Sequence, residues 1–148
     1  MNNGRKPIAF SRDGHWLLST GTDGVSRPWA LTGQEVGAQP IELHGHDKAV
    51  ETAAFSRVKP WLVTGSYDDT IRLWNLNAKD ISASSAVLMH YKAGFSTVAF
   101  ANDWLLTANS SETAHLGQLS EDGSPTQSIL LPINGNRISN GAFTDDGR

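Results

Sequence analysis

Apolar and polar residues alternate along most of the chain in short runs, and turn-forming residues separate the runs. Four such runs follow one another in the middle of the chain, at residues 49–56, 61–66, 70–76 and 84–90. A period of two places successive side chains on opposite faces of a strand, and the chain shows little of the 3.6-residue period of an amphipathic helix. The pattern therefore predicts an all-β protein built from short antiparallel strands.

The alternating pattern also repeats along the chain. A phenylalanine preceded by alanine recurs at Phe10, Phe55, Phe100 and Phe143, with spacings of 45, 45 and 43 residues. Two sets of leucines recur at the same spacings: Leu31, Leu76 and Leu119, and Leu43, Leu88 and Leu131. Four strands in about 45 residues are typical of one β-propeller blade, and blades pack face to face because none can bury both faces alone. We therefore expect Phe55 and Phe100 to be buried between blades.

The repeat divides residues 1–148 into two complete and two partial units. A first blade with a truncated inner strand covers 1–44, a complete second blade 45–89, a third blade 90–132, and the inner strand of a fourth blade 133–148. A propeller typically closes with about 4 to 8 blades, so we expect an incomplete ring. Both ends fall inside blades, which favours a fragment of a longer protein over a protomer that completes a ring by oligomerisation.

The stretch Gly45–Leu76 carries a Gly-His opening, a strand with a threonine, an aspartate turn and a closing Trp-Asn. It resembles a WD-repeat (WD40) unit, the blade of a β-propeller family in which Trp-Asp is the usual ending. The resemblance implies four-stranded antiparallel blades and a buried hydrogen-bonded series of four side chains. In this chain the four are His46, Thr64, Asp68 and Trp74. Such a series would fix strand register without leaving polar groups unpaired.

The first unit keeps part of this tetrad. Ser19, Asp23 and Trp29 stand where the threonine, aspartate and tryptophan stand in the second unit, but the position of the histidine falls on Met1. Pro28 interrupts the third strand of this unit, and proline cannot donate a backbone hydrogen bond. The sequence therefore predicts a partial tetrad here.

The third unit departs further from the pattern. Thr107 is retained, whereas Tyr91 replaces the histidine, Ser111 the aspartate and Gly117 the tryptophan. Its core loses an indole and its polar series is not expected to close. We therefore expect a degenerate third blade that is looser than the second.

Composition narrows the classes of partner. The 148 residues are 39% hydrophobic and 18% charged, with a net charge of −3 and no run of like charge, so neither nucleic acid nor a membrane is an expected partner. The chain has no cysteine, which excludes disulfides and thiolate metal sites. The first residues contain no apolar stretch typical of a signal peptide, so a cytoplasmic location is expected.

A few residues invite a catalytic or metal-binding interpretation. His44, His46 and Asp47 could supply metal ligands, but the resemblance assigns His46 to the structural network. The pairs Asp68–Asp69 and Asp145–Asp146 could act as acid-base groups or calcium ligands, but both occupy turns where aspartate caps its own backbone. We therefore assign no catalytic, cofactor-binding or metal-binding residue and expect no enzymatic activity.

Three functions remain open. The resemblance favours a non-catalytic scaffold whose loops bind a protein or peptide partner. An alternative is a sensor or specificity module in a bacterial multidomain signalling protein fused to an ATPase, protease-like or kinase domain. A propeller enzyme is disfavoured, because only Lys48 and Glu51 supply charge near the innermost strand of the intact unit. Uncovered blade faces also predict contact with further blades of a parent chain or self-association.

Overall fold

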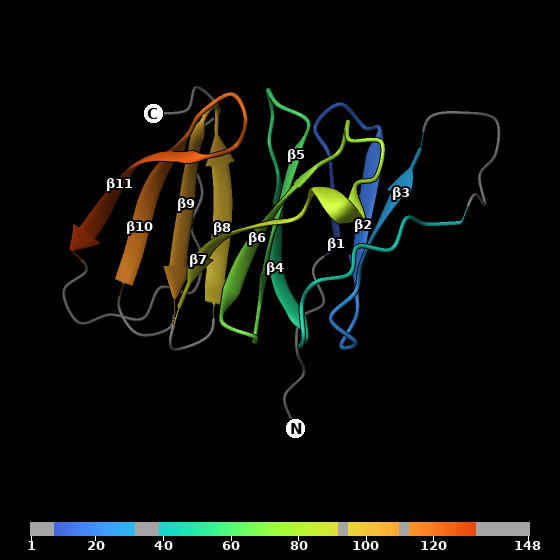
Figure 1. Cartoon of the computed structure of the whole chain (residues 1–148), viewed down its shortest axis with the longest axis horizontal. Coiled ribbons are helices and arrows are strands. Elements are labelled where there is room, and N and C mark those ends of the chain that lie inside the picture. The colour runs from blue at the N-terminus through green and yellow to red at the C-terminus, as the bar shows by residue number, and fades with distance from the viewer. Residues whose placement is uncertain (1–7, 32–38, 92–94, 110–112, 133–148) are drawn as a thin grey trace.

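The computed structural model describes residues 8–31, 39–91, 95–109 and 113–132. Within them, eleven strands form three antiparallel sheets that stand side by side (Figure 1). The helical element in these ranges is one short 3-10 turn, η1 (Ser82–Ser84). The all-β fold of antiparallel propeller blades in an open ring is therefore confirmed.

The first sheet has three strands, where the sequence predicted four. They are β1 (Ile8–Phe10), β2 (Trp16–Thr20) and β3 (Ser26–Ala30), in the order β1-β2-β3. A fourth strand is reduced to one isolated bridge between Ser26 and Leu43, whose backbone atoms exchange hydrogen bonds of 2.9 and 3.4 Å.

Pro28 accounts for this short outer edge. Its carbonyl accepts a hydrogen bond from the amide of Ile41 at 3.1 Å, so this position faces the missing outer strand. In an antiparallel strand the N–H and C=O of one residue point to the same neighbour, and proline has no N–H to give. The outer ladder therefore lacks a donor where it would need one.

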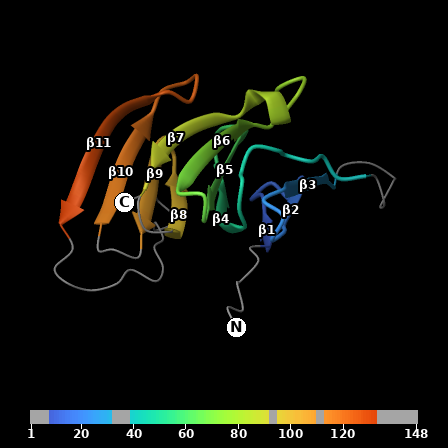
Figure 2. The same cartoon turned by 60° about the horizontal axis from the view of Figure 1, so that its bottom comes forward.

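The second and third sheets each have four strands. The second contains β4 (Val50–Phe55), β5 (Trp61–Ser66), β6 (Thr70–Asn75) and β7 (Ala86–His90), in chain order. The third contains β8 (Phe95–Ala101), β9 (Trp104–Asn109), β10 (Thr113–Leu119) and β11 (Pro125–Pro132), also in chain order. Figure 2 shows the third, second and first sheets following one another as neighbouring blades.

The core lies in the two seams between the blades. The first seam joins the first and second blades through Leu18, Leu43, Leu62, Trp74, Leu76 and Ile81. The second seam joins the second and third blades through Trp61, Val63, Ile71, Leu73, Tyr91, Val98, Phe100, Leu105 and Leu119. Every residue of β5 is buried, because its alternating side chains enter both seams.

Two of the repeated phenylalanines, Phe55 and Phe100, show the direction of packing, since each lies against the preceding blade. Phe100 is buried in the second seam, as predicted. Phe55 packs against the first seam but is only partly buried. Phe10 is 67% exposed, because no described residue forms a blade in front of the first one.

Two glycines with left-handed backbone provide a matched test of blade packing. Gly24, in the β2–β3 turn, has φ +77°, and a Cβ there would lie 2.5 Å from the carbonyl oxygen of His46 in the next blade. Gly14 has φ +72°, and a Cβ there would meet nothing within 4 Å. Gly14→Ala should lower the free energy of unfolding by roughly 1 kcal/mol through backbone strain alone.

Gly24→Ala should lower the free energy of unfolding by a further ~1–3 kcal/mol, because the backbone of the neighbouring blade must also shift. Urea titrations followed by tryptophan fluorescence measure both losses. Equal losses for the two variants would show that the turn and the next blade do not pack as closely as described.

Candidate functional site

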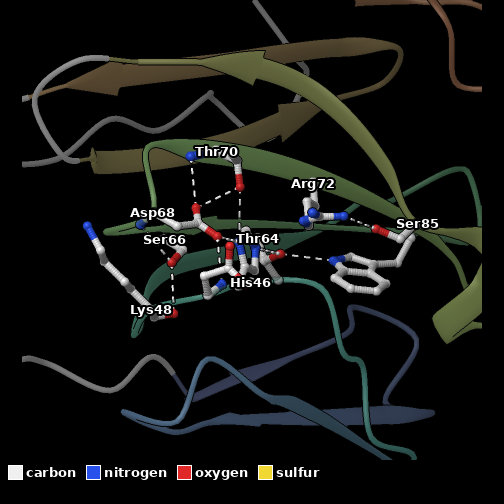
Figure 3. Close-up of polar contacts among 10 residues, drawn as sticks. His46, Lys48, Thr64, Ser66, Asp68, Thr70, Arg72 and Ser85 are labelled. Carbon is white, nitrogen blue, oxygen red and sulfur yellow. Dashed lines mark hydrogen bonds and ion pairs between the residues drawn. The ribbon is translucent and has the colours of Figure 1, made fainter.

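The described residues hold a polar network at the edge of the second blade where the β5–β6 turn lies (Figure 3). His46 comes from the segment before β4, Thr64 from β5, Asp68 from the β5–β6 turn and Trp74 from β6. Thr64 and Trp74 are both 0% exposed, and the His46 side chain is buried as well. The structure therefore brings together the four residues that the resemblance assigns to the tetrad.

The four side chains form one continuous series of hydrogen bonds. His46 Nδ1 lies 2.9 Å from Asp68 Oδ2, and His46 Nε2 lies 2.8 Å from Thr64 Oγ1. The indole Nε1 of Trp74 donates to the same Thr64 oxygen at 2.9 Å. Because an ionised carboxylate only accepts, Nδ1 carries the ring proton, and the Thr64 hydroxyl then donates to Nε2. Each donor in the series has an acceptor.

Further groups that the sequence analysis did not identify complete the network. The hydroxyl and the amide of Thr70 donate to Asp68 Oδ1 at 2.7 and 2.9 Å, and the amide of Asp47 donates to Oδ2 at 3.0 Å. Ser66 accepts from the amide of Asp68 at 3.2 Å and donates to the carbonyl of Lys48 at 2.8 Å. The signal in the sequence is Thr70 two residues after Asp68, a spacing typical of an aspartate that caps its own turn.

Burial and hydrogen bonding set the ionisation of the network. Partial burial raises the pKa of Asp68, but the hydrogen bonds from Thr70, His46 and two backbone amides outweigh it and lower the pKa to about 2. Burial lowers the pKa of His46, and the positive charge of Arg72 adds to this, against the opposite effect of Asp68. At neutral pH the pair is therefore a carboxylate and a neutral imidazole.

The lowered pKa of His46 predicts a loss of stability in mild acid. The unfolded chain takes up this proton near the usual pKa of 6.5, whereas the folded chain resists it, so the free energy of unfolding should fall as the pH drops below about 6.5. Urea titrations at pH 7.5 and pH 5 measure this fall. His46→Gln removes the titrating group and should make the fall smaller, since Asp68 contributes only at lower pH. If the free energy of unfolding of the variant falls by the same amount between pH 7.5 and pH 5, the loss of stability does not arise from His46.

The first blade keeps one bond of the series. Trp29 Nε1 donates to Ser19 Oγ at 3.0 Å, as Trp74 does to Thr64 in the second blade. Asp23 instead accepts from Arg27 at 2.8 Å and from the amide of Val25 at 3.1 Å. The partial tetrad is thus divided between an indole–hydroxyl pair and a surface ion pair.

The third blade replaces the series with separate pairs. The hydroxyl of Tyr91 shares a hydrogen bond with Thr107, in the relation that His46 has to Thr64. Asn109 Oδ1 accepts from the amide and hydroxyl of Thr113 at 3.1 and 2.8 Å, as Asp68 does from Thr70. Ser111, the expected counterpart of Asp68, lies outside the described residues. The sequence analysis identified Tyr91 as the replacement of the histidine but missed Asn109, because Asn109 stands two positions before Ser111, the expected counterpart of Asp68.

The residues considered above as metal ligands or acid-base groups lie in different surroundings in the structure. His44 Nε2 lies 3.3 Å from Glu42 on the surface, whereas both ring nitrogens of His46 face the network. Asp69 is a turn residue with φ 67°, and Asp145–Asp146 lie outside the described residues. Where the structure describes the chain, no three His, Asp or Glu side chains gather as metal ligands. The same residues contain no helix of the length and apolar character that crossing a membrane requires.

Comparisons with known proteins agree with this geometry. Residues 37–75 match the family WD40, described as "WD domain, G-beta repeat". The chain is similar to a chain in a crystal structure of the mitotic checkpoint complex, with a TM-score of 0.73 and 20% identity over 95% of this chain and 43% of that one. A structure of U3-55K and one of the RRP9 WD40 repeats each give a TM-score of 0.67 and 21% identity over 84% of this chain and 36% of theirs.

The chain thus spans less than half the length of each of these three solved chains. No curated protein sequence matches it. The matched residues 37–75 include all four members of the His46 network. The structural likeness to the chain in the mitotic checkpoint complex covers 95% of this chain. The chain therefore carries a WD40 repeat and has the fold of part of a WD40 β-propeller.

Proposed function

We propose that this chain is a non-catalytic interaction module that binds a protein or peptide partner in the cytoplasm. The WD40 fold generally mediates protein–protein interaction, and the observation that supports a non-catalytic role most directly is the closed network around His46. Its imidazole, carboxylate, hydroxyl and indole form hydrogen bonds with one another inside a blade. Catalysis would need such groups to reach a substrate.

The surfaces available for binding are the two edges where turns join the strands. Turns between strands carry exposed side chains on a rigid scaffold, which is where binding residues gather in β-propellers. Lys48 and Asp47 are exposed at the edge of the β5–β6 turn, and Arg57 and Val58 are exposed at the opposite edge. Either edge can therefore present a binding surface.

The face of the first blade that no described blade covers is a further contact surface. Ile8 and Phe10 are 72% and 67% exposed, although the same repeat position is covered in the second and third blades. We propose that this face receives a further blade, from a longer chain or from a second copy. Light scattering at about 100 µM should detect association, and a purely monomeric sample would contradict the second copy.

Affinity purification with quantitative mass spectrometry tests the binding role. The wild-type chain should enrich a defined set of proteins over bead-only controls, and charge reversal at one edge should release at least one of them. The two variants are Lys48→Glu for one edge and the pair Arg12→Glu and Arg57→Glu for the other. A list identical for the wild type, both variants and a urea-unfolded sample would contradict the proposal.

A further inference from the structure

A groove opens at the first seam, on the edge of the blades opposite the His46 network. It has a volume of about 340 Å³ and lies between the β1–β2 turn of the first blade and the β4–β5 turn of the second. Figure 1 shows both turns at the upper edge of the sheets. That volume is at the lower end of small-ligand sites and suits one or two side chains of an extended segment. The network around His46 does not reach it.

Two equivalent turns form the walls of this groove. Each begins with Ser-Arg, at residues 11–12 and 56–57, which are 45 residues apart. The serine hydroxyls hold both turns in shape, since Ser11 Oγ accepts from the amide of Trp16 at 2.9 Å and Ser56 Oγ from the amide of Lys59 at 3.2 Å. The repeat therefore places two arginines at corresponding points of neighbouring blades.

The corresponding turn of the third blade lacks these features. Ala101 takes the place of the serine, and the turn consists of Asn102 and Asp103, with Asn102 at φ 51°. It has no arginine and is shorter than the other two turns. The pair of arginine-bearing turns thus belongs to the first seam among the described blades.

Basic side chains outnumber carboxylates among the residues that line the rim of the groove. Arg12, Arg57 and Lys59 line it together with a single carboxylate, Asp13. Asp13 is engaged within its own turn, where it accepts hydrogen bonds from the Ser11 hydroxyl and from the amide of His15. Lys59 lies 3.5 Å from Glu121, whose side chain is 98% exposed, so solvent screens that pair strongly. In a chain of net charge −3, this rim favours an anionic ligand.

Part of the groove lining is apolar. Trp16 and Phe55 contribute to it and are both partly buried, and Leu76, a buried residue of the first seam, also lines the groove. An apolar or aromatic side chain entering here would remove surface from water at about 25 cal/mol per Å². A ligand that fits both the basic and the apolar parts of the lining combines such a side chain with flanking negative charges.

We propose that this groove binds an extended acidic peptide segment in which an aromatic side chain lies between Asp or Glu residues. The aromatic side chain would rest on Trp16 and Phe55, and the flanking carboxylates would pair with Arg12 and Arg57. The proposal rests on the proposed binding function and adds to it the location of one site and the chemistry of its partner. A single-stranded nucleic acid is the competing anionic ligand, and the negative net charge of the chain disfavours it.

Fluorescence anisotropy tests the groove directly. The probe is a fluorescein-labelled peptide, Glu-Asp-Glu-Phe-Glu-Asp-Glu, at about 50 mM salt, where exposed charges are weakly screened. The chain should bind it at least tenfold more tightly than the neutral analogue with Gln and Asn in place of Glu and Asp. Arg12→Glu combined with Arg57→Glu should weaken binding at least tenfold, whereas Lys48→Glu, a charge reversal at the other edge, should leave it within twofold.

Circular dichroism and thermal melts establish whether the double variant is folded. Should it unfold, the single variants Arg12→Gln and Arg57→Gln replace it, each with an expected loss of about threefold. Absence of peptide binding up to about 1 mM, or equal binding by wild type and arginine variants, would overturn the proposal. Tighter binding of a labelled oligothymidylate than of the peptide, lost in the arginine variants, would also overturn it and assign the groove to nucleic acid.

The affinity purification separates this proposal from the broader one. A set of captured proteins that is unchanged by the two arginine substitutions, but lost in an unfolded sample, would leave the binding function in place and remove the groove from it. If the wild type captures no protein specifically but still binds the acidic peptide, the groove remains a peptide site and the broader binding function is contradicted.

Discussion

Trp74→Ala should lower the free energy of unfolding by about 3–5 kcal/mol, the largest loss expected from a single substitution in this chain. Trp74 is 0% exposed and lies in the first seam, where its indole fills space between two blades. The substitution also removes the donor to Thr64 Oγ1. Urea titrations followed by circular dichroism measure the loss, because the removed indole would alter a fluorescence signal.

The matched control is Trp29→Ala. Trp29 occupies the same repeat position and makes the same bond, to Ser19, but it is only partly buried because its face of the first blade is uncovered. Its loss should be at most half as large. If Trp74→Ala prevents folding altogether, Trp74→Phe keeps most of the ring volume and should cost about 1–3 kcal/mol, mainly through the lost donor. Similar losses at the two tryptophans would refute the packing of the first seam.

Asp68→Ala should lower the free energy of unfolding by about 1–3 kcal/mol at pH 7. Its carboxylate accepts hydrogen bonds from the His46 ring, the Thr70 hydroxyl and amide, and the Asp47 amide. Removing the acceptor leaves these donors without their partner in a site where the histidine side chain is fully buried. Urea titrations give the loss, and proton NMR of the His46 ring N–H reports whether the imidazole remains ordered.

Asp23→Ala is the control for the same turn position in the first blade. Asp23 is half exposed and pairs with Arg27, so its removal should cost well under 1 kcal/mol beyond the loss of its turn hydrogen bond to Val25. The comparison isolates the network, because both changes delete an aspartate from an equivalent turn. A loss at Asp23 as large as that at Asp68 would mean that turn capping, and not the network, accounts for the effect.

Several features could be predicted from the residues because the repeat presents the same pattern in more than one unit. The alternating pattern located the strands of the second blade, and the spacings of 45 and 43 residues aligned the other units with it. Register in the first and third blades follows the same spacing, since Leu43 pairs with Ser26 and Leu131 with Ala114. The tetrad residues were identified by resemblance, and the structure places them within hydrogen-bonding distance.

Other features depend on three-dimensional details that a repeat alignment does not encode. The outer strand of the first blade is lost through a missing donor at Pro28, whose effect depends on which neighbour that position faces. Asn109 replaces an aspartate from a different sequence position, because its side chain reaches the same amide from the end of β9. The groove arises only where two long turns meet across a seam, so neither turn reveals it alone.

The burial of β5 on both faces predicts slow hydrogen–deuterium exchange of its amides. Its amides are bonded to β4 and β6, and side chains from three blades shield the strand from water. Hydrogen–deuterium exchange at Leu62, Val63 and Thr64 therefore requires the whole assembly to open, whereas β3, with its outer ladder reduced to one bridge, can exchange through local fraying. The slowest amides at the centre of the second blade should therefore report the free energy of global unfolding.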